Sequence, residues 1–274
     1  MRRTLTVTIA AAALVLGLAA CGSSDETGTS TPPDAALKVG VNPVPHGEIL
    51  KYVKDNLAEK AGLKLDIVEF TDYVQPNRAL ADGQLDANYF QHVPYLDEEK
   101  AAKGYKFTAL KPVHIEPLGL YSKKVKNLAD LPAKGVIAIP NDPSNSGRAL
   151  NLLAQNGLIK LKDGAGVKAT QRDIAENPKQ LQFRELEAAQ LPRSLDDTAA
   201  SVINGNYAIE TGLKPATDAL VLEKGEGNPY ANLVVVRDGG ESDPRVGKLE
   251  ELLHSPEVKK FIEEKYQGSV LAAF

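Results

Sequence analysis

From Leu37 onward, short runs of β-branched residues alternate with longer segments in which apolar residues recur at helical spacing. LKVGV (37–41) and LDIVEF (65–70) have the composition of buried strands. The segment between them carries an apolar stripe typical of one helical face: Ile49, Leu50, Val53 and Leu57. This order predicts a βαβ unit with parallel strands.

The rest of the chain repeats this alternation. Further strands are predicted near residues 85–90, 117–122, 135–140, 181–186, 199–203 and 232–237. Helices are predicted at 76–83, from Pro94 onward, at 146–157 and as one final helix at 243–266. Gly157 suits the C-terminal stop of the third of these helices, because glycine readily adopts a left-handed backbone conformation.

Two such series predict an α/β fold with two lobes, each a mostly parallel sheet flanked by helices. The chain is expected to cross between the lobes near Lys111–Glu116 and again near Asn204–Glu210, and the C-terminal helix is expected to return to the first lobe. The predicted lobe 1 comprises residues 37–112 and 207–274, and the predicted lobe 2 comprises residues 113–206.

The N-terminus has the pattern of an export signal. Arg2 and Arg3 precede an apolar or weakly polar run at 4–20 that ends in small residues, so residues 1–20 are predicted to be a cleaved signal peptide. A retained membrane anchor is the alternative, but a spanning helix usually needs about 20 apolar residues. Residues 22–36 lack large apolar side chains, which predicts a flexible tether over 21–36.

Cysteine usage and charge narrow the classes of function. Cys21 is the only cysteine in the sequence, so no internal disulfide can form. LAAC at 18–21 resembles the lipobox of bacterial lipoproteins, in which the thiol receives a lipid; a free or buried thiol is the alternative. The net charge is −4 and the basic residues are dispersed, which argues against nucleic-acid binding.

Polar and aromatic residues follow several of the predicted strands. In open α/β sheets, ligands bind beyond the carboxyl ends of the strands. The residues that this rule selects come from distant parts of the chain: Asn42, His46, Tyr73, Phe90, His92, Tyr95, Asn145, Arg148 and Asn206. We therefore expect these side chains to lie at comparable sheet edges.

Arg148 is predicted to lie in the first turn of a helix, where the helix dipole disfavours a cation by several tenths of a kcal/mol. A bound anion would offset that cost, and a guanidinium can bind a carboxylate with two hydrogen bonds. Asn145 can donate or accept beside it. The alternative is an arginine on the exposed surface.

Aromatic residues are concentrated in one short stretch. The chain has no Trp, yet Tyr89, Phe90 and Tyr95 fall within seven positions around His92. With Tyr73, such rings could surround an apolar or sulfur-containing side chain, and each aromatic–sulfur contact is worth about 0.3–1.5 kcal/mol. Ordinary core packing is the alternative.

The signals for a metal or for catalysis are weak. The histidines show no HxH or HExxH spacing, and His114 with Glu116 is the best remaining pair for a metal. A metal-binding receptor that uses His92, His114 and acidic neighbours therefore stays open as an alternative. No GxSxG or phosphate-binding GxxxxGK[ST] motif occurs, so we expect neither an enzyme nor a cofactor.

Several long motifs resemble the NlpA family of lipoproteins, in particular the methionine-binding proteins of ABC importers. The motifs are DIVEFTDYVQPNRALADGQLDANYFQHVPYL, VHIEP, IPNDPSNSGRAL, ELEAAQLPRSLDD and VINGNYA, and the resemblance extends from about Leu37 to Phe274. It implies a two-lobed periplasmic-binding-protein fold with the ligand cleft between the lobes.

The resemblance also implies a function. The protein would capture methionine, with L-methionine expected first, and deliver it to an ABC permease and its ATPase subunit. It would act as a monomer, held by lipid on Cys21 at the extracytoplasmic face of a bacterial membrane. Family members that bind D-methionine or a methionine-containing dipeptide leave the exact ligand open.

Roles for individual residues follow from the same resemblance. It implies a side-chain pocket formed by Tyr73, Phe90, His92 and Tyr95, a carboxylate clamp at Arg148, and polar contacts from Asn145, Asn206 and Asn232. Asn232 lies at the start of a predicted strand rather than after its end, so the rule of strand ends does not select it.

Overall fold

The computed structural model describes residues 35–274. The predicted signal peptide, the lipidated Cys21 and nearly all of the predicted tether lie outside this range. Within residues 35–274, no helix combines the length and the apolar character that a membrane span requires.

The first sheet has six strands in the order β13-β4-β12-β3-β1-β2. Their bounds are β1 (Leu37–Val41), β2 (Leu65–Glu69), β3 (Ala87–His92), β4 (Phe107–Ile115), β12 (Ala231–Arg237) and β13 (Leu271–Ala272). β1 runs parallel to β2 and β3, whereas β12 runs antiparallel to β3 and β4. This sheet and the helices packed on it are called the first lobe.

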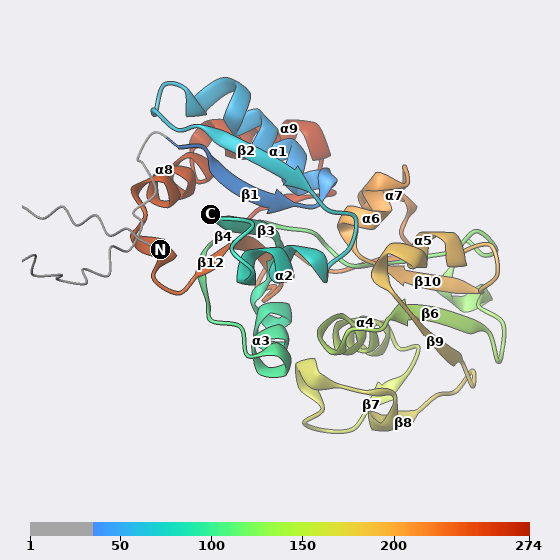
Figure 1. Ribbon diagram of the computed structural model, residues 1–274. Helices are drawn as coiled ribbons and strands as arrows, with labels where there is room; N and C mark the ends of the chain where they lie inside the picture. Colours follow the sequence, from blue (N-terminus) through green and yellow to red (C-terminus); the bar gives the residue numbers. More distant parts are fainter. Residues whose placement is uncertain (1–34) are drawn as a thin grey trace, which may run out of the picture. The chain divides into compact units, whose positions relative to one another are not determined.

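Helices cover both faces of the first sheet (Figure 1). One face packs against α1 (Glu48–Val53), α8 (Pro244–Leu253) and α9 (Pro256–Tyr266) through an aliphatic core. The other packs against α2 (Gln75–Ala81) and α3 (Val93–Lys103). Successive β12 residues alternate between these cores, with Val234 and Val236 on one face and Leu233 and Val235 on the other, as a doubly covered strand requires.

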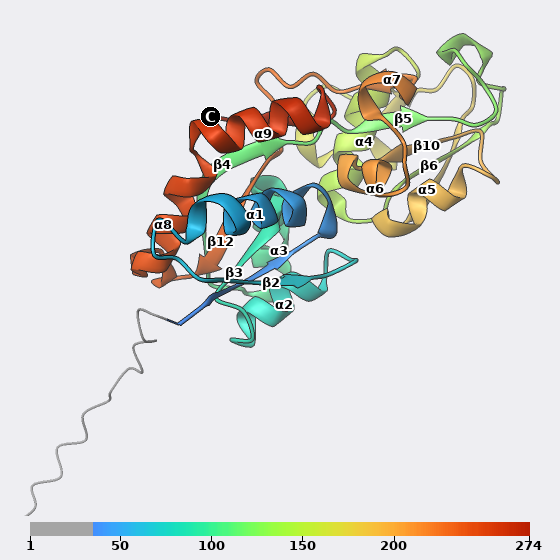
Figure 2. The same ribbon diagram turned by 90° about the horizontal axis from the view of Figure 1, so that it is seen from above.

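The second sheet has five strands in the order β11-β5-β10-β6-β9 and defines the second lobe, which groups with α4–α7 in Figure 2. Its strands are β5 (Gly119–Tyr121), β6 (Val136–Pro140), β9 (Gln182–Leu186), β10 (Ala200–Ile203) and β11 (Val221–Leu222). Its helices are α4 (Pro143–Gln155), α5 (Leu191–Ser194), α6 (Gly205–Glu210) and α7 (Pro215–Asp218). A separate hairpin pairs β7 (Lys160–Leu161) with β8 (Ile174–Glu176).

Short helical turns complete the described elements. η1 (Pro43–Gly47) and η2 (Lys54–Ala58) flank α1 and, with it, form most of the helix predicted after the first strand. The others are η3 (Leu128–Asp130), η4 (Gly166–Lys168), η5 (Gln171–Asp173), η6 (Ala188–Gln190) and η7 (Gly240–Ser242). The prediction of a two-lobed α/β fold is confirmed. The prediction that each sheet is mostly parallel is wrong, because β4, β12 and β13 pair antiparallel in the first sheet and β5 and β11 pair antiparallel in the second.

Two segments connect the lobes. The first crossing, residues 116–118, joins β4 to β5, close to the predicted position. The second crossing, residues 223–230, joins β11 to β12 and lies later in the chain than the predicted Asn204–Glu210. The reason is that β11 pairs antiparallel with β5, which keeps the chain on the second sheet through Leu222.

The predicted final helix is two helices. α8 ends at Leu253 and α9 begins at Pro256, because proline has no N–H to donate and its ring clashes with the preceding turn. Ser255 caps α9 by accepting the N–H of Val258 at 3.3 Å. Both helices pack on the first sheet, as expected for the C-terminal segment.

Helix α4 begins earlier than its apolar pattern indicates. It starts at Pro143, and the carboxylate of Asp142 caps it by accepting the N–H of Asn145 at 2.8 Å. Arg148 therefore lies in the second turn, where the helix dipole is weaker than in the predicted first turn. The helix ends as predicted, with Gly157 in a left-handed conformation just beyond it.

Candidate functional site

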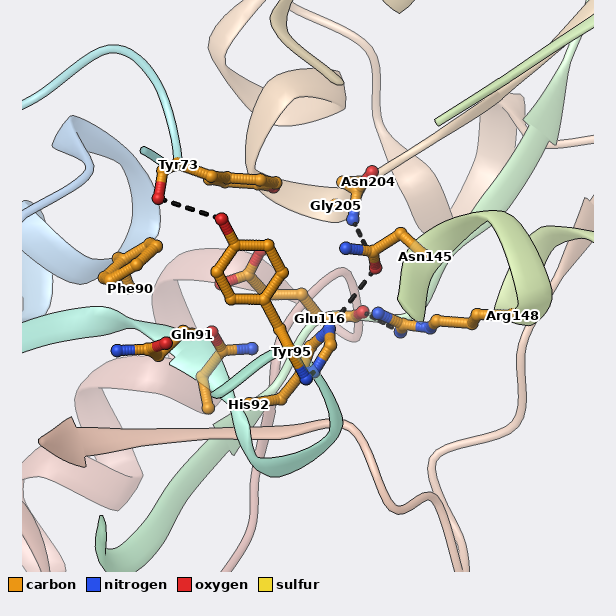
Figure 3. A pocket seen from close by; sticks show the side chains of 11 residues that line it. Tyr73, Phe90, Gln91, His92, Tyr95, Glu116, Asn145, Arg148, Asn204 and Gly205 are labelled. Atoms are coloured by element: carbon orange, nitrogen blue, oxygen red, sulfur yellow. Dashed lines mark hydrogen bonds between the residues drawn. The ribbon is translucent and has the colours of Figure 1, made fainter. Parts of the chain in front are cut away.

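Side chains from both lobes line one pocket at the ends of their strands (Figure 3). The first lobe and the first crossing contribute Tyr73, Phe90, Gln91, His92, Tyr95, Glu116 and Asn232. The second lobe contributes Asn145, Arg148, Asn204 and Gly205. Together they surround about 320 Å³ of unfilled space, part of it open to solvent.

Seven of the eight residues selected from the sequence as ligand-binding line this pocket: Tyr73, Phe90, His92, Tyr95, Asn145, Arg148 and Asn232. The eighth, Asn206, lies beside it and accepts the hydroxyl of Tyr73 at 2.6 Å. Asn42 and His46 also follow a strand but lie elsewhere. Asn42 donates to the carbonyl of Phe70 at 2.7 Å, and His46 belongs to a buried cluster described below.

Three aromatic rings form an apolar cup in the pocket. The ring centroids of Tyr73, Phe90 and Tyr95 lie 5.9–6.0 Å from one another, with tilted or edge-to-face geometry. The hydroxyl of Tyr95 donates to the carbonyl of Tyr73 at 3.0 Å, which fixes the position of its ring. Burial raises the pKa of Tyr73 and of Tyr95, so both hydroxyls stay protonated donors. The cup thus presents ring faces and edges without charge.

A chain of hydrogen bonds orients the amides of the second lobe (Figure 3). Asn145 donates to the carboxylate of Asp142 at 3.0 Å, which leaves its Oδ1 as an acceptor. That oxygen accepts Asn204 Nδ2 at 3.0 Å and His92 Nε2 at 3.3 Å. His92 Nδ1 accepts the N–H of Tyr95, so its Nε2 carries the proton. Burial, and then the charge of Arg148, lowers the pKa of His92 to about 3, which keeps the ring neutral.

Two asparagine side chains of the second lobe each have one polar atom without a hydrogen-bond partner in the described residues. Asn204 Oδ1 and Asn206 Nδ2 are buried and make no hydrogen bond to any residue of 35–274. One is an acceptor and the other is a donor. A buried polar atom without a partner costs about 1–3 kcal/mol, so a ligand that offers a donor and an acceptor here would recover that energy.

Arg148 is 3% exposed, so the surface alternative is wrong. Its Nε and Nη2 donate to the carboxylate of Glu223 at 2.9 and 2.5 Å, and Nη2 also donates to the carbonyl of Glu116 at 2.9 Å. The anion that a buried guanidinium needs is supplied here by the chain itself. Within residues 35–274, Nη1 makes no hydrogen bond, and it is the guanidinium nitrogen available to a ligand.

Glu116 lines the pocket, and its carboxylate contacts residues of both lobes. Its Oε1 accepts His114 Nε2 at 2.7 Å. His46 Nε2 lies 3.0 Å from the same oxygen and forms a hydrogen bond with Asn232 Oδ1 at 3.1 Å, and both histidines belong to the first lobe. Glu116 Oε2 accepts the N–H of Asn206, from the second lobe, at 2.8 Å. Burial raises the pKa of Glu116 and lowers the pKa of His46 to about 4 and of His114 to about 3.

His46, His114 and Glu116 are the residues of 35–274 that could hold a metal ion. The 2.7 and 3.0 Å separations are hydrogen-bond distances, and shorter than the roughly 3.4 Å between ligands in a tetrahedral zinc site with bonds near 2.1 Å. His92, named in the metal alternative, lies outside this cluster and bonds to Asn145. The geometry thus favours a hydrogen-bonded network.

Four lining residues were not selected as ligand contacts from the sequence. Asn204 and Gly205 directly follow the predicted strand at 199–203, so the rule of strand ends would have found them. Glu116 follows β4, a strand that the sequence pattern did not indicate. Gln91 lies inside β3 and bonds to Asn77 at 2.7 Å, and no sequence signal distinguishes it.

The sequence profile of the NlpA lipoprotein family matches residues 37–274. The chain is 42% identical to the probable D-methionine-binding lipoprotein MetQ of Vibrio cholerae over 265 residues, which cover 97% of this chain and 96% of that protein. It is 42% identical to the D-methionine-binding lipoprotein MetQ of Escherichia coli K12 over 258 residues, 93% of each.

Among solved structures, a nutrient-binding protein from Burkholderia cenocepacia, bound to methionine, has the same fold. It is 50% identical to this chain, with a TM-score of 0.84, and the match covers 87% of this chain and all of that one.

Proposed function

Because the chain belongs to the NlpA lipoprotein family, a family of substrate-binding transport proteins rather than enzymes, we propose that it is a receptor for methionine that serves an ABC importer. It captures the free amino acid between its lobes and delivers it to a permease driven by an ATPase. Lipid on Cys21 tethers it to the extracytoplasmic face of the membrane, where it acts as a monomer.

One observation carries this proposal: an aromatic cup and a guanidinium line the same pocket. The thioether of methionine fits the cup formed by Tyr73, Phe90 and Tyr95, where each sulfur–aromatic contact is worth about 0.3–1.5 kcal/mol. Each methylene buried there adds about 0.8 kcal/mol. An acidic or basic side chain would enter the same cup without a charged partner, which favours an apolar one.

The head group of an amino acid matches the polar half of the pocket. Arg148 Nη1 and the unpaired Asn206 Nδ2 are donors suited to a carboxylate. The unpaired Asn204 Oδ1 is an acceptor suited to an ammonium group, and the carboxylate of Glu116 lies in the same pocket. A zwitterion therefore satisfies the atoms of both signs that the protein leaves without partners.

Calorimetry with purified protein tests the proposal directly. We expect saturable heat with L-methionine, and weaker binding of D-methionine and of glycyl-methionine, because the pocket is small and its head-group contacts have fixed positions. L-leucine, which has no sulfur, is the control for shape alone. If none of the methionine-containing compounds produces heat or a thermal shift, methionine is not the ligand; if D-methionine binds more tightly, the L assignment is wrong.

Replacing Phe90 with alanine is expected to weaken L-methionine binding by about 1–2 kcal/mol, because the side chain loses one wall of its cup. The affinity for L-alanine, whose methyl group is too short to reach the cup, should change little. Phe70→Ala is the matched control, since Phe70 is partly buried in the same lobe and does not line the pocket. Equal losses for both ligands would instead make Phe90 a residue that only supports the fold.

A further inference from the structure

Glu223 lies at the point where the second crossing leaves the second sheet, directly after β11. Its Oε2 accepts Arg148 Nη2 at 2.5 Å, the N–H of Leu118 at 3.0 Å and Asn228 Nδ2 at 3.2 Å. Its own N–H donates to the carbonyl of Leu118 at 2.9 Å. Leu118 belongs to the first crossing and Asn228 to the second. One carboxylate therefore joins both connections between the lobes to the guanidinium that lines the pocket.

These contacts leave the guanidinium little freedom. Glu223 holds Nε and Nη2 from one side, and the carbonyl of Glu116, in the first crossing, also accepts Nη2. The ring of Tyr230 lies 4.3 Å from Arg148 Cζ and packs on the guanidinium plane. With two nitrogens and one face fixed, only Nη1 is left for the pocket, and its direction is set by Glu223.

The charge of Glu223 has two opposite effects on a ligand carboxylate. As a counter-ion it neutralises Arg148, which weakens the attraction between the guanidinium and a second anion. As a support it holds Nη1 in place before the ligand arrives, which reduces the ordering cost of binding. The four hydrogen bonds to its carboxylate oxygens, and its side-chain exposure of 11%, favour the support.

We propose that Glu223 is a positioning residue for the ligand's carboxylate, and that it makes the grip of Arg148 depend on the arrangement of the two crossings. The inference rests on the proposed function, because it assumes that Arg148 binds the carboxylate of an amino acid. In this arrangement, a relative movement of the lobes that displaces either crossing also displaces Nη1. Binding of the carboxylate and the relative position of the lobes are thus coupled through one side chain.

The test compares Glu223→Gln with the wild-type protein, using L-methionine and L-methioninamide, which lacks the carboxylate. Glutamine has the same size, but its NH₂ group would face one of the guanidinium N–H groups, so it cannot hold both nitrogens. We expect the affinity for L-methionine to fall about tenfold and the affinity for L-methioninamide to change less than twofold. Glu226→Gln, an exposed glutamate of the same crossing, is the matched control and should change neither affinity.

The outcomes separate the two claims. If the wild-type protein does not bind methionine, the proposed function fails, and the inference fails with it. If the wild type binds and Glu223→Gln binds L-methionine as tightly or more tightly, Glu223 is only a counter-ion. If both ligands weaken equally, its role is purely structural. Should Glu223→Gln not fold, Glu223→Asp takes its place, because the shorter side chain cannot reach Arg148 and Leu118 together, and the same outcomes decide.

Discussion

Replacing Arg148 with alanine is expected to weaken L-methionine binding by about 2–5 kcal/mol, or about 30-fold to several thousand-fold. The ligand carboxylate would lose its charged partner inside a largely buried pocket. Glu223 would also lose the two bonds that Arg148 provides, and it is 11% exposed. Calorimetric titration measures the loss. Arg193→Ala, at an exposed position on α5, is the control and should bind like the wild type.

The same substitution should lower the stability of the protein without ligand, because breaking a buried ion pair leaves an uncompensated charge. The thermal unfolding of the ligand-free variant should therefore be measured together with the titration. Arg148→Lys separates charge from geometry: lysine keeps the positive charge but cannot form the two-nitrogen contact with Glu223. Wild-type affinity in Arg148→Ala would remove Arg148 from the binding site altogether.

Acid is expected to destabilise the fold steeply, starting below about pH 6.5. Burial lowers the pKa of His46 to about 4, and that of His92 and His114 to about 3, whereas in the unfolded chain each titrates near its ordinary 6.5. Between those values the unfolded state binds more protons, so the free energy of unfolding falls as the pH falls. Each histidine contributes up to about 1.4 kcal/mol per pH unit.

Two carboxyl groups oppose this loss of stability in acid. Burial raises the pKa of Glu116 and of Asp142, so in part of this range the folded state takes up their protons first. We therefore expect a net loss of about 1–3 kcal/mol per pH unit rather than the full sum. Urea unfolding at pH 7.5, 6.5 and 5.5 measures it. His92→Gln should flatten the slope by about one proton. A flat profile over this range would contradict the neutral, buried histidines.

Local patterns predicted most strands of both sheets, because these strands are short runs that contain Val or Ile, as in β1, β2, β6, β10 and β12, or aromatic residues, as in β3, β5 and β9. β4 was missed because Lys111 and Pro112 interrupt its apolar pattern, and its register with β12 shifts beside Pro112. The late second crossing was missed because β11 is two residues long. Such a strand has no periodicity to detect, and only its pairing with β5 makes it part of the second sheet.

The rule of strand ends located most of the pocket because β1, β2 and β3 are parallel, as are β6, β9 and β10. The rule did not select Asn232, and the reason is the direction of its strand. β12 runs antiparallel to β3, and its first residues pair with the last residues of β3, with Asn232 opposite His92. The start of β12 therefore lies at the same edge as the ends of its neighbours, which only the strand directions reveal.

The partner of Arg148 was beyond the reach of sequence reasoning. Glu223 is 75 positions away along the chain and meets the guanidinium only because the second crossing starts at that point. The sequence pattern predicted an anion beside Arg148 from a first-turn position that the structure does not confirm. The buried guanidinium does need an anion, but a ligand and a distant glutamate satisfy that need equally well. The distinction depends on long-range contacts.

The place of β12 in the first sheet has a consequence for how the chain folds. β12 pairs with both β3 and β4, yet residues 116–230 separate β4 from β12 along the sequence. The strands of the second sheet all lie within residues 119–222, so that half can fold from a continuous piece of chain. The other half cannot be completed until its last strands are synthesised and available, because β3 and β4 lack their shared neighbour before then. A chain that emerges N-terminus first through a narrow channel thus keeps its leading half open until the very end of its passage.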